Sequence, residues 1–546
     1  MRVSSSVRAA ALCFAAAAAL AAQSAGSLSP RLQTSGGATQ LFVDGKPFLI
    51  LGGELFNNSA TSLDYMKPIW PRLTAMHLNT VLAPISWALL EPSEGKFDFT
   101  LVDGLIAGAR AHNLRLVFLW FGSWKNTWSS YAPEWVKRDL NRFPRVQLHG
   151  GAGTERLSPF SDTARDADAR AFSALMRRIR QTDATAHTVI MVQVENEVGV
   201  IPDARDYSPA ANAAYDQPVP RALLDYLQKQ KDTLDPDLRA RWAATGFGVS
   251  GAWPAVFGPG PETEDLFMAW HYALYIGKVA AAGKAEYDLP MFVNAALIRP
   301  SYAPGQYNSG GPLPHSMDLW KAAAPKLDFL APDIYFELKN WCAKYDRPGN
   351  PLFVPEAAGG IQGAANAFYA IGHHRGLGFS PFAIDGPSSS AAPEFARSYE
   401  TLAELAPLIL DNQPKGTVEA VLLEDLTPSQ RIRLGDFTFS ISSAGPRRFS
   451  PGEPAVADAP RELTPHGIFI ATAPDEFYMA GSGLSLTVSP ATPGPPIAGI
   501  ATVEEGHFVD GKWVRGRTLA GDDTGQGNSI ALRGETILRV LLYRYQ

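Results

Sequence analysis

The chain has 546 residues, of which 46% are hydrophobic and 19% are charged, and its formal net charge is -6. This composition is typical of a globular protein with two or three domains and excludes a largely disordered chain. The acidic balance and the lack of a long basic run argue against nucleic acid as a partner. The 12 Trp, 17 Tyr and 28 Phe suit a protein that stacks on flat apolar faces such as sugar rings, although a large core also uses aromatic residues.

The first 25 residues have the pattern of a secretory signal peptide. Arg2 and Arg8 form a positive start, 9–22 is a short apolar run, and small residues follow as far as Ala25. The run is too short to span a bilayer comfortably, and no later segment is long and apolar enough to do so. We therefore expect residues 1–25 to be removed and the protein to be exported, periplasmic or extracellular, with no membrane contact afterwards.

Strand and helix patterns alternate through most of the chain, which is typical of a parallel sheet with crossover helices. A small hairpin is predicted at 41–48. Eight strands in one catalytic domain at 38–412 predict a (β/α)8 TIM barrel, with an insertion at about 202–260 over its mouth. The predicted strands are 48–52, 78–85, 114–121, 189–197, 289–295, 327–335, 351–355 and 378–384. The predicted helices include 66–76, 101–111, 169–182, 264–282, 313–323 and 400–410.

The pattern changes after 414–416 to short alternating runs separated by turns. These runs predict an all-β sandwich domain at 416–546, smaller than the barrel. We expect this domain to brace the barrel rather than bind polysaccharide, because the sequence contains no evident row of exposed aromatic residues. The runs are 418–423, 432–441, 467–471, 484–488, 499–504, 529–532 and 536–545.

The fourth predicted strand ends in an unusual polar cluster. A run of Val, Ile and Met leads into Gln193, Glu195, Asn196 and Glu197. Carboxylates are rarely buried unless they are paired or functional. A buried strand that ends in polar side chains is what a parallel barrel shows where it opens into an active site.

A second acidic residue, Glu356, ends the seventh predicted strand. Strands four and seven of a barrel end at the same mouth, so Glu197 and Glu356 can flank one bond. Glycoside hydrolysis needs such a pair of carboxyl groups. The histidines are scattered and form no HExxH motif, and there is no Gly-x-Ser-x-Gly elbow, so we expect neither a metal nor a cofactor.

The segment 193–199, QVENEVG, resembles the QxENEYG signature of glycoside hydrolase family 35, the retaining β-galactosidases of clan A. The segment 91–98, EPSEGKFD, matches the EPxxGxFDF stretch of that family. The likeness covers roughly residues 38–405 and is closest to the divergent bacterial branch with a C-terminal β-domain. It implies that Glu197 is the acid/base and Glu356 the nucleophile.

The same resemblance implies roles for two further residues in the site, and this sequence differs from the family pattern at three positions. Asn196 would bind the hydroxyl beside the anomeric carbon, and Tyr335 would hold the nucleophile. The Tyr of the signature is Val198 here, and the Tyr that the family has before its strand-two Trp aligns near Pro84. A sugar-binding Glu is replaced by Ser123, and Lys125 and Asn126 are the candidates to take its place.

Further substrate-binding candidates follow the first three strands. They are Glu54 after the first strand, Trp87 after the second, and Trp124 and Trp128 after the third. Packing at the barrel rim is the alternative for each Trp. Strict alternation also places Glu195 and Glu197 on one face of the strand and Asn196 on the other. The family role needs Asn196 and Glu197 on the same side, so we expect a bulge or twist there.

The sequence thus predicts a retaining, exo-acting glycoside hydrolase that releases terminal β-linked galactose from oligo- or polysaccharides, plant cell-wall side chains among them. The same mechanism on another sugar, as in a β-glucosidase or an α-L-arabinopyranosidase, is an alternative. A third hypothesis, from a different functional class, is a barrel that binds carbohydrate without catalysis. The expected partner is a β-galactoside, and no oligomeric state is predicted.

Overall fold

A computed structural model describes residues 29–386, 393–424, 429–444 and 464–546, so the expected signal peptide lies outside the described residues. Eight parallel strands close into a barrel in the order β10-β11-β12-β13-β4-β5-β6-β9, which confirms the predicted TIM barrel. The barrel strands are β4 (Ile50–Glu54), β5 (Thr80–Ser86), β6 (Arg115–Lys125), β9 (Val189–Asn196), β10 (Met291–Ala296), β11 (Phe329–Ile334), β12 (Val354–Ala357) and β13 (Gly378–Pro381).

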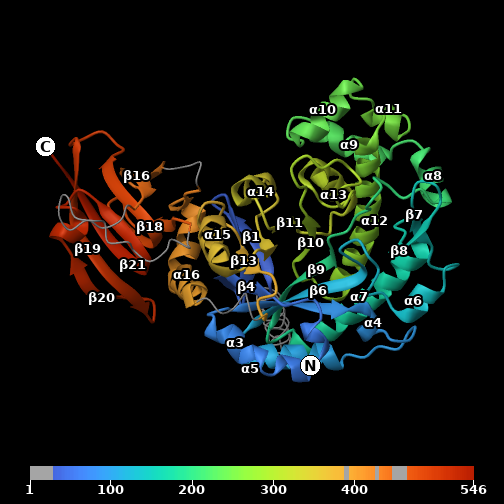
Figure 1. The fold of residues 1–546 in the computed structure, drawn as a ribbon, viewed down its shortest axis with the longest axis horizontal. Coiled ribbons are helices and arrows are strands. Elements are labelled where there is room, and N and C mark those ends of the chain that lie inside the picture. The colour runs from blue at the N-terminus through green and yellow to red at the C-terminus, as the bar shows by residue number, and fades with distance from the viewer. Residues whose placement is uncertain (1–28, 387–392, 425–428, 445–463) are drawn as a thin grey trace, which may run out of the picture.

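Helices surround the barrel and bury one face each (Figure 1). In α5, for example, Val102, Leu105, Ile106 and Ala109 recur at helical spacing and are buried. Within the described residues, no helix is both long and apolar enough to cross a membrane. The helices outside the insertion are α2 (Leu63–Met66), α3 (Ile69–Ala75), α4 (Trp87–Leu90), α5 (Thr100–Ala111), α6 (Glu134–Arg138), α7 (Asp162–Asp183), α12 (Pro261–Glu286), α13 (Met317–Ala323), α14 (Leu338–Tyr345), α15 (Gly360–Gly372) and α16 (Pro393–Asn412).

Short strands and an insertion decorate the barrel. The predicted hairpin is present, with Asp44 and Gly45 at positive φ in its turn, and a further strand precedes it. Between β9 and α12 the chain forms four short helices, which lie with α13 at the edge of the barrel away from the C-terminal strands (Figure 1). These elements are β1 (Arg31–Ser35), β2 (Ala38–Val43), β3 (Lys46–Phe48), β7 (Arg145–Gln147), β8 (Gly153–Leu157), α8 (Pro209–Tyr215), α9 (Arg221–Lys229), α10 (Pro236–Ala244) and α11 (Trp253–Phe257).

The C-terminal region is all-β, as predicted. Its eight strands are hydrogen-bonded into one antiparallel sheet, in which the long strand β18 pairs with β16 and β17 on one side and with β21 on the other. The strands are β14 (Val418–Leu422), β15 (Ser429–Leu434), β16 (Phe437–Ser443), β17 (His466–Ala471), β18 (Glu476–Pro490), β19 (Ile497–Val509), β20 (Lys512–Leu519) and β21 (Ile530–Tyr545).

Alternate side chains of this sheet serve two different cores. On β17, Ile468 and Ile470 join the large hydrophobic cluster of the barrel, whereas Phe469 joins a separate cluster within the sheet region. This alternation follows from the period-two geometry of a strand. The sheet packs on α15, and Figure 1 shows the C-terminal strands on the side of the barrel where α15 and α16 lie. The C-terminal region therefore shares an apolar interface with the barrel.

Candidate active site

Five titratable side chains converge where the barrel strands end. They come from different strands: Glu54 from β4, Lys125 from β6, Glu197 directly after β9, Asp333 from β11 and Glu356 from β12. Carboxylate oxygens of Glu197, Asp333 and Glu356 lie within 4.8 Å of one another. The register explains part of this convergence, because Asp333 and Glu356 are direct partners across β11 and β12. The two acids singled out from the sequence thus meet at one mouth, on the fourth and seventh strands.

Glu356 is 5% exposed and is held from one side by Tyr335. The Tyr335 hydroxyl donates a hydrogen bond of 2.5 Å to Oε1 of Glu356, while Oε2 has no hydrogen-bond partner among the residues that the structure describes. Burial and the charge of Glu197 raise the pKa of Glu356 to about 7, against the opposing effects of Lys125 and Tyr335. Tyr335 therefore has the contact expected of it, and it leaves one nucleophile oxygen free.

The surroundings of Glu54 and Asp333 favour the protonated form of each carboxyl. Burial and the neighbouring Glu356 raise the pKa of each carboxyl well above its ordinary value. Each is no more than 2% exposed and retains one oxygen without a hydrogen-bond partner among the described residues. A protonated Glu54 can donate a hydrogen bond to Glu356 and thereby stabilise its carboxylate. Glu54 thus lies in the site, as predicted.

Lys125 supplies the positive charge of the site. Its side chain is buried and interacts electrostatically with Glu356, Glu197, Glu54 and Asp333. Burial alone would lower the pKa of Lys125, but the surrounding carboxyls outweigh it and the pKa lies above the ordinary value. The ammonium also donates a 2.7 Å hydrogen bond to Oδ1 of Asn126.

The three close carboxylates are also the residues here that could hold a metal ion. A cation needs several oxygen ligands and repels a neighbouring ammonium. Lys125 already provides compensating charge to the same carboxyls, so this donor set does not fit a resident divalent metal well.

The end of β9 is distorted on both sides of Asn196. Glu195 has φ 62° and Glu197 has φ 43°, a left-handed backbone that costs a residue with a Cβ about 1–3 kcal/mol. The register between β6 and β9 also shifts, because Trp120 pairs with Val194 but Lys125 pairs with Asn196. This irregularity is the bulge that the sequence argument required.

Glu195 stabilises that bulge through hydrogen bonds and does not face the mouth of the barrel. Its buried carboxyl accepts hydrogen bonds from the backbone N–H groups of Ser123 at 3.1 Å and Trp124 at 2.7 Å. Burial and the adjacent Asp168 raise the pKa of Glu195 well above its ordinary value. Asp168 in turn accepts hydrogen bonds from the Ser123 hydroxyl and the Trp120 indole. Ser123 therefore belongs to a supporting network and does not line the mouth.

The backbone of Glu197 is fixed by two asparagines. Its N–H donates to Oδ1 of Asn294 at 3.0 Å, and its carbonyl accepts from Nδ2 of Asn308 at 2.9 Å. Asn294 also donates to Asp333 at 2.6 Å, which ties the acid on β11 to the end of β9. Our reading of the sequence missed Asp333, Asn294 and Asn308. Asp333 could have been found, because strand alternation places it on the same face as Tyr335.

Asn196 has both side-chain polar atoms buried and without a partner among the described residues. A buried amide without hydrogen bonds costs about 1–3 kcal/mol. Such a cost is tolerated where a ligand satisfies the group. Asn196 therefore carries an unsatisfied buried amide beside Glu197, and its contact with a sugar hydroxyl stays a prediction.

Two of the predicted sugar-stacking residues are core residues instead. Trp87 and Trp124 are both 0% exposed, and their indole N–H groups bond to Glu91 and to the Leu157 carbonyl. No ring face of either is available to a ligand, so these two predictions are wrong. Trp128 is 44% exposed and packs against Arg156 at the rim. The local sequence could not distinguish these cases, because all three tryptophans follow barrel strands.

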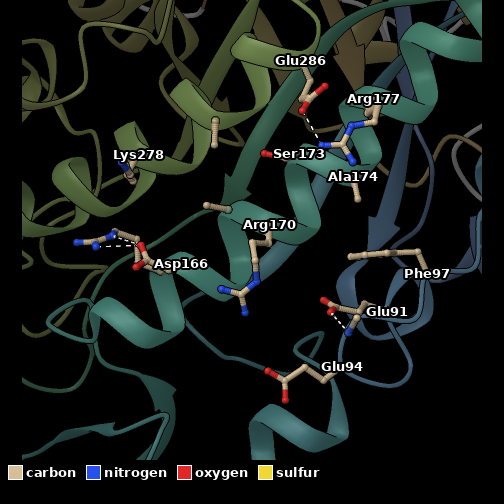
Figure 2. Close-up of a pocket in the computed structure, with 14 residues that line it drawn as sticks. Glu91, Glu94, Phe97, Asp166, Arg170, Ser173, Ala174, Arg177, Lys278 and Glu286 are labelled. Carbon is tan, nitrogen blue, oxygen red and sulfur yellow. Dashed lines mark hydrogen bonds and ion pairs between the residues drawn. The ribbon is translucent and has the colours of Figure 1, made fainter.

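A large groove on the outer surface is separate from this site. It lies beside α7 and α12, and Figure 2 shows Arg170 and Lys278 at its sides without drawn partners. Its charges balance, with four acidic and four basic side chains, so it has no net preference for an anion or a cation. They are Glu91, Glu94, Asp166, Glu286, Arg165, Arg170, Arg177 and Lys278.

Comparisons with known proteins show a similarity between part of the barrel and glycoside hydrolases. Residues 63–248 match the family model of glycosyl hydrolase family 42, described as β-galactosidase. Residues 395–531 match a domain of unknown function, DUF5597. A β-galactosidase of Xanthomonas manihotis is 29% identical over 190 residues, which are 34% of this chain and 29% of that protein. The chain thus matches less than a third of the length of this relative.

Solved β-galactosidase structures resemble the fold only in part. The enzyme of Bacillus circulans sp. alkalophilus gives a TM-score of 0.45 at 15% identity, over 66% of this chain and 57% of that chain. Gan42B, a family 42 β-galactosidase, gives 0.47 at 12% identity, over 94% of this chain and 100% of that chain.

Together, the comparisons show that residues 63–248 are similar to the glycoside hydrolases of family 42. They do not confirm the expected membership of family 35.

Proposed function

We propose that this protein is a retaining, exo-acting glycoside hydrolase that releases terminal β-linked galactose. The observation that carries the proposal is the separation of Glu197 and Glu356, whose carboxylate oxygens lie within 4.8 Å. Retaining glycosidases have their two carboxyl groups about 5–5.5 Å apart, whereas inverting enzymes need about 6.5–9.5 Å to admit a water molecule. The spacing therefore favours a covalent intermediate over direct attack by water.

The surroundings of the two acids suggest which is the nucleophile. Tyr335 and Lys125 both favour the ionised form of Glu356, and its second oxygen is free to attack. Glu197 is half-buried, and the hydrogen bonds from Asn294 and Asn308 hold its backbone. Its carboxyl lies beside those of Asp333 and Glu356, where it can exchange a proton with a bound substrate.

In the first step, Glu197 protonates the glycosidic oxygen while an oxygen of Glu356 bonds to the anomeric carbon and the leaving group departs. In the second step, Glu197 takes a proton from water, which attacks the anomeric carbon and frees Glu356. The sugar leaves with its original anomeric configuration.

Substrate binding would use polar side chains near the two acids, of which Asn196 and Glu54 have atoms without a hydrogen-bond partner among the described residues. Asn196 is suited to bind the hydroxyl next to the anomeric carbon, and Glu54, Lys125 and Asn126 are suited to the remaining hydroxyls. Galactose is proposed because the matched family and the curated relative are both described as β-galactosidases. We further propose export to the periplasm or exterior, from the pattern of residues 1–25, and terminal galactose on plant cell-wall side chains as the natural target.

Two variants in the presence of azide test the assignment. Glu356→Ala should abolish turnover of a nitrophenyl β-galactoside, and azide should restore part of it while forming the α-galactosyl azide. Glu197→Ala should instead give the β-galactosyl azide, because the covalent intermediate still forms. Full activity of Glu356→Ala, or the same azide anomer from both variants, would contradict the roles. Nitrophenyl β-glucoside and α-L-arabinopyranoside, assayed alongside, test the choice of sugar, and binding without turnover on all three would support a non-catalytic barrel.

A further inference from the structure

A second cavity, of about 740 Å³, opens between the insertion helices and the loop that follows β10. We call it the Tyr302 cleft. Its lining includes Asp237 and Arg241 from α10, Glu262 from α12, and Tyr302 and His315 from the loop. The residues of the catalytic mouth do not line it. Its volume lies within the range of about 300–1,000 Å³ that is typical of small-molecule sites.

The lining of the cleft combines apolar surface with charged groups. Buried Leu238, Phe257 and Leu266 supply the apolar surface, and the ring of Tyr302 is 47% exposed. The guanidinium of Arg241 lies 3.1 Å from the carboxylate of Glu262. Sugars present apolar C–H faces to aromatic rings and paired hydroxyls to planar charged groups, so this mixture suits a saccharide better than a wholly apolar ligand.

One wall of the cleft is rigidly braced. Buried Asp265 accepts hydrogen bonds from the Tyr307 hydroxyl at 2.6 Å and the Gly310 N–H at 2.5 Å. Its Oδ2 also lies 2.7 Å from Nε2 of His315. One carboxylate thus joins three points of the loop to α12. A preformed wall reduces the entropy that binding would cost.

The loop that forms this wall also contacts the proposed acid/base. Tyr302, Pro304 and Tyr307 line the cleft, while the next residue, Asn308, donates to the Glu197 carbonyl. Ser309 pairs with Val200 shortly after the end of β9. One loop therefore connects the cleft to the end of β9 that carries Glu197, the residue proposed to protonate the leaving group.

We propose that the Tyr302 cleft is a distal saccharide-binding site. It holds the leaving-group end of an extended oligosaccharide while the terminal galactose occupies the catalytic mouth. The proposal rests on the proposed hydrolase function and deepens it, because it makes an oligomeric or polymeric glycan the substrate class. Tyr302 stacks on a sugar ring, and Asp237 and the Arg241–Glu262 pair bind hydroxyls.

Tyr302→Ala in the full-length protein tests this site. The readout is the ratio of kcat/KM for a long substrate to kcat/KM for nitrophenyl β-galactoside. The long substrates are β-1,4-galactotetraose and xyloglucan oligosaccharides with terminal β-galactose. We expect the ratio to fall about tenfold for at least one of them, the size of effect that loss of one aromatic contact gives. Tyr302→Phe, which retains the ring, should keep the ratio of the unchanged protein.

Tyr543→Ala is the matched control, because Tyr543 is 49% exposed and lies on β21, away from the cleft. An equal fall in the ratio for this variant would overturn the proposal, as would an unchanged ratio in Tyr302→Ala with both long substrates.

A binding experiment separates this proposal from the proposed function. In Glu356→Gln protein, calorimetric titration with the same oligosaccharides should give a Kd that Tyr302→Ala raises about tenfold. If Tyr302→Ala raises the Kd but the unchanged protein hydrolyses no β-galactoside, the proposed function is refuted and the binding site in the cleft is supported. Hydrolysis of the galactoside with a Kd independent of Tyr302 would refute the cleft alone.

Discussion

The ionisation of Glu356 depends on a small set of neighbours. Burial and Glu197 oppose its charge, while Lys125, Tyr335 and a protonated Glu54 support it. With a pKa of about 7 in the free protein, the carboxylate is only partly ionised at neutral pH. Removing a neighbour that supports the charge should therefore raise the pKa of Glu356 and move the pH dependence of activity to higher pH, and removing one that opposes the charge should do the reverse.

Tyr335→Phe removes the hydroxyl that donates to Glu356 at 2.5 Å. That hydrogen bond lowers the pKa of Glu356, so its loss raises the pKa and moves the acidic limb of the kcat/KM profile to higher pH. A hydrogen bond to a charged group contributes about 1.5–3 kcal/mol, so kcat/KM should fall about 10- to 100-fold. A pH–rate profile measures both effects. Tyr65→Phe, at a 60% exposed position, is the control, and an acidic limb that stays in place or moves to lower pH would refute the argument.

The raised pKa of Glu54 gives a second prediction. Because burial and Glu356 raise the pKa of Glu54 well above its ordinary value, an amide should replace it with little electrostatic change. Glu54→Gln should retain kcat/KM to within about tenfold, the effect of one altered hydrogen bond of about 1 kcal/mol. Glu356→Gln should lose almost all turnover. Steady-state kinetics compares the two variants, and an equally severe loss in both would show that Glu54 acts as a carboxylate.

At the scale of elements, the end of β6 shapes the site. A Cβ built on Gly122 would lie 2.6 Å from Oε1 of Glu195 and 2.3 Å from the Trp120 indole nitrogen. Glycine is required there because the buried carboxyl of Glu195 approaches the backbone of the bulge. This close approach lets Glu195 accept hydrogen bonds from the N–H groups of Ser123 and Trp124, which position the end of β6 that carries Lys125.

Gly122→Ala should therefore disturb both stability and activity. Overpacking of this kind costs about 1–3 kcal/mol of unfolding free energy. Urea unfolding measures that loss, and kcat should fall with it because Lys125 and Glu197 shift. Gly153→Ala is the matched control, because a Cβ there meets no atom within 4 Å. Equal stability of the two variants would show that the bulge is not tightly packed.

Much of the barrel could be predicted because its strands and helices follow from the pattern of apolar residues along short stretches of sequence. Strands β5 and β9 are wholly buried and each contains a run of apolar residues, and α5 repeats its apolar residues every three or four positions. Glu197 and Glu356 could be paired because strand count alone places both at one mouth. The bulge followed from the conflict between period-two alternation and the roles of Asn196 and Glu197.

Other features depend on contacts that the sequence does not encode locally. The burial of Trp87 and Trp124 is set by the helices packed over them, and Trp87, for example, lies edge-on to Trp135. Strand β20 escaped prediction because most of its residues are exposed and three of its eight residues are charged, with little apolar alternation. The segments 529–532 and 536–545 belong to one long strand, β21, which the turn-like residues between them concealed.

At the scale of the whole molecule, the C-terminal sheet is part of the barrel's hydrophobic packing. Gly372 at the end of α15 would bring a Cβ within 2.5 Å of the Cβ of Ala420 on β14 and 3.1 Å of Ile468 on β17. The sheet and the helix therefore meet without space for a methyl group. This interface supports the prediction that the C-terminal domain braces the barrel.

Gly372→Val should weaken that interface and lower Tm. Overpacking predicts a loss of about 1–3 kcal/mol, whereas kcat/KM at 25 °C should change little because the site lies at the strand ends. Differential scanning calorimetry and steady-state kinetics check the two parts. Gly534→Ala in the same sheet has no atom within 4 Å of the new Cβ and serves as control. A Gly372→Val protein as stable as the control would refute tight packing.

The assignment of Glu356 as the nucleophile of a retaining enzyme is tested most directly by trapping the intermediate. A 2-deoxy-2-fluoro-β-galactosyl fluoride should react with the protein and accumulate as a covalent sugar adduct. Peptide mass spectrometry should place that adduct on Glu356, and Glu356→Gln should form none. An adduct on Glu197, or hydrolysis that releases α-galactose with no adduct at all, would contradict the account.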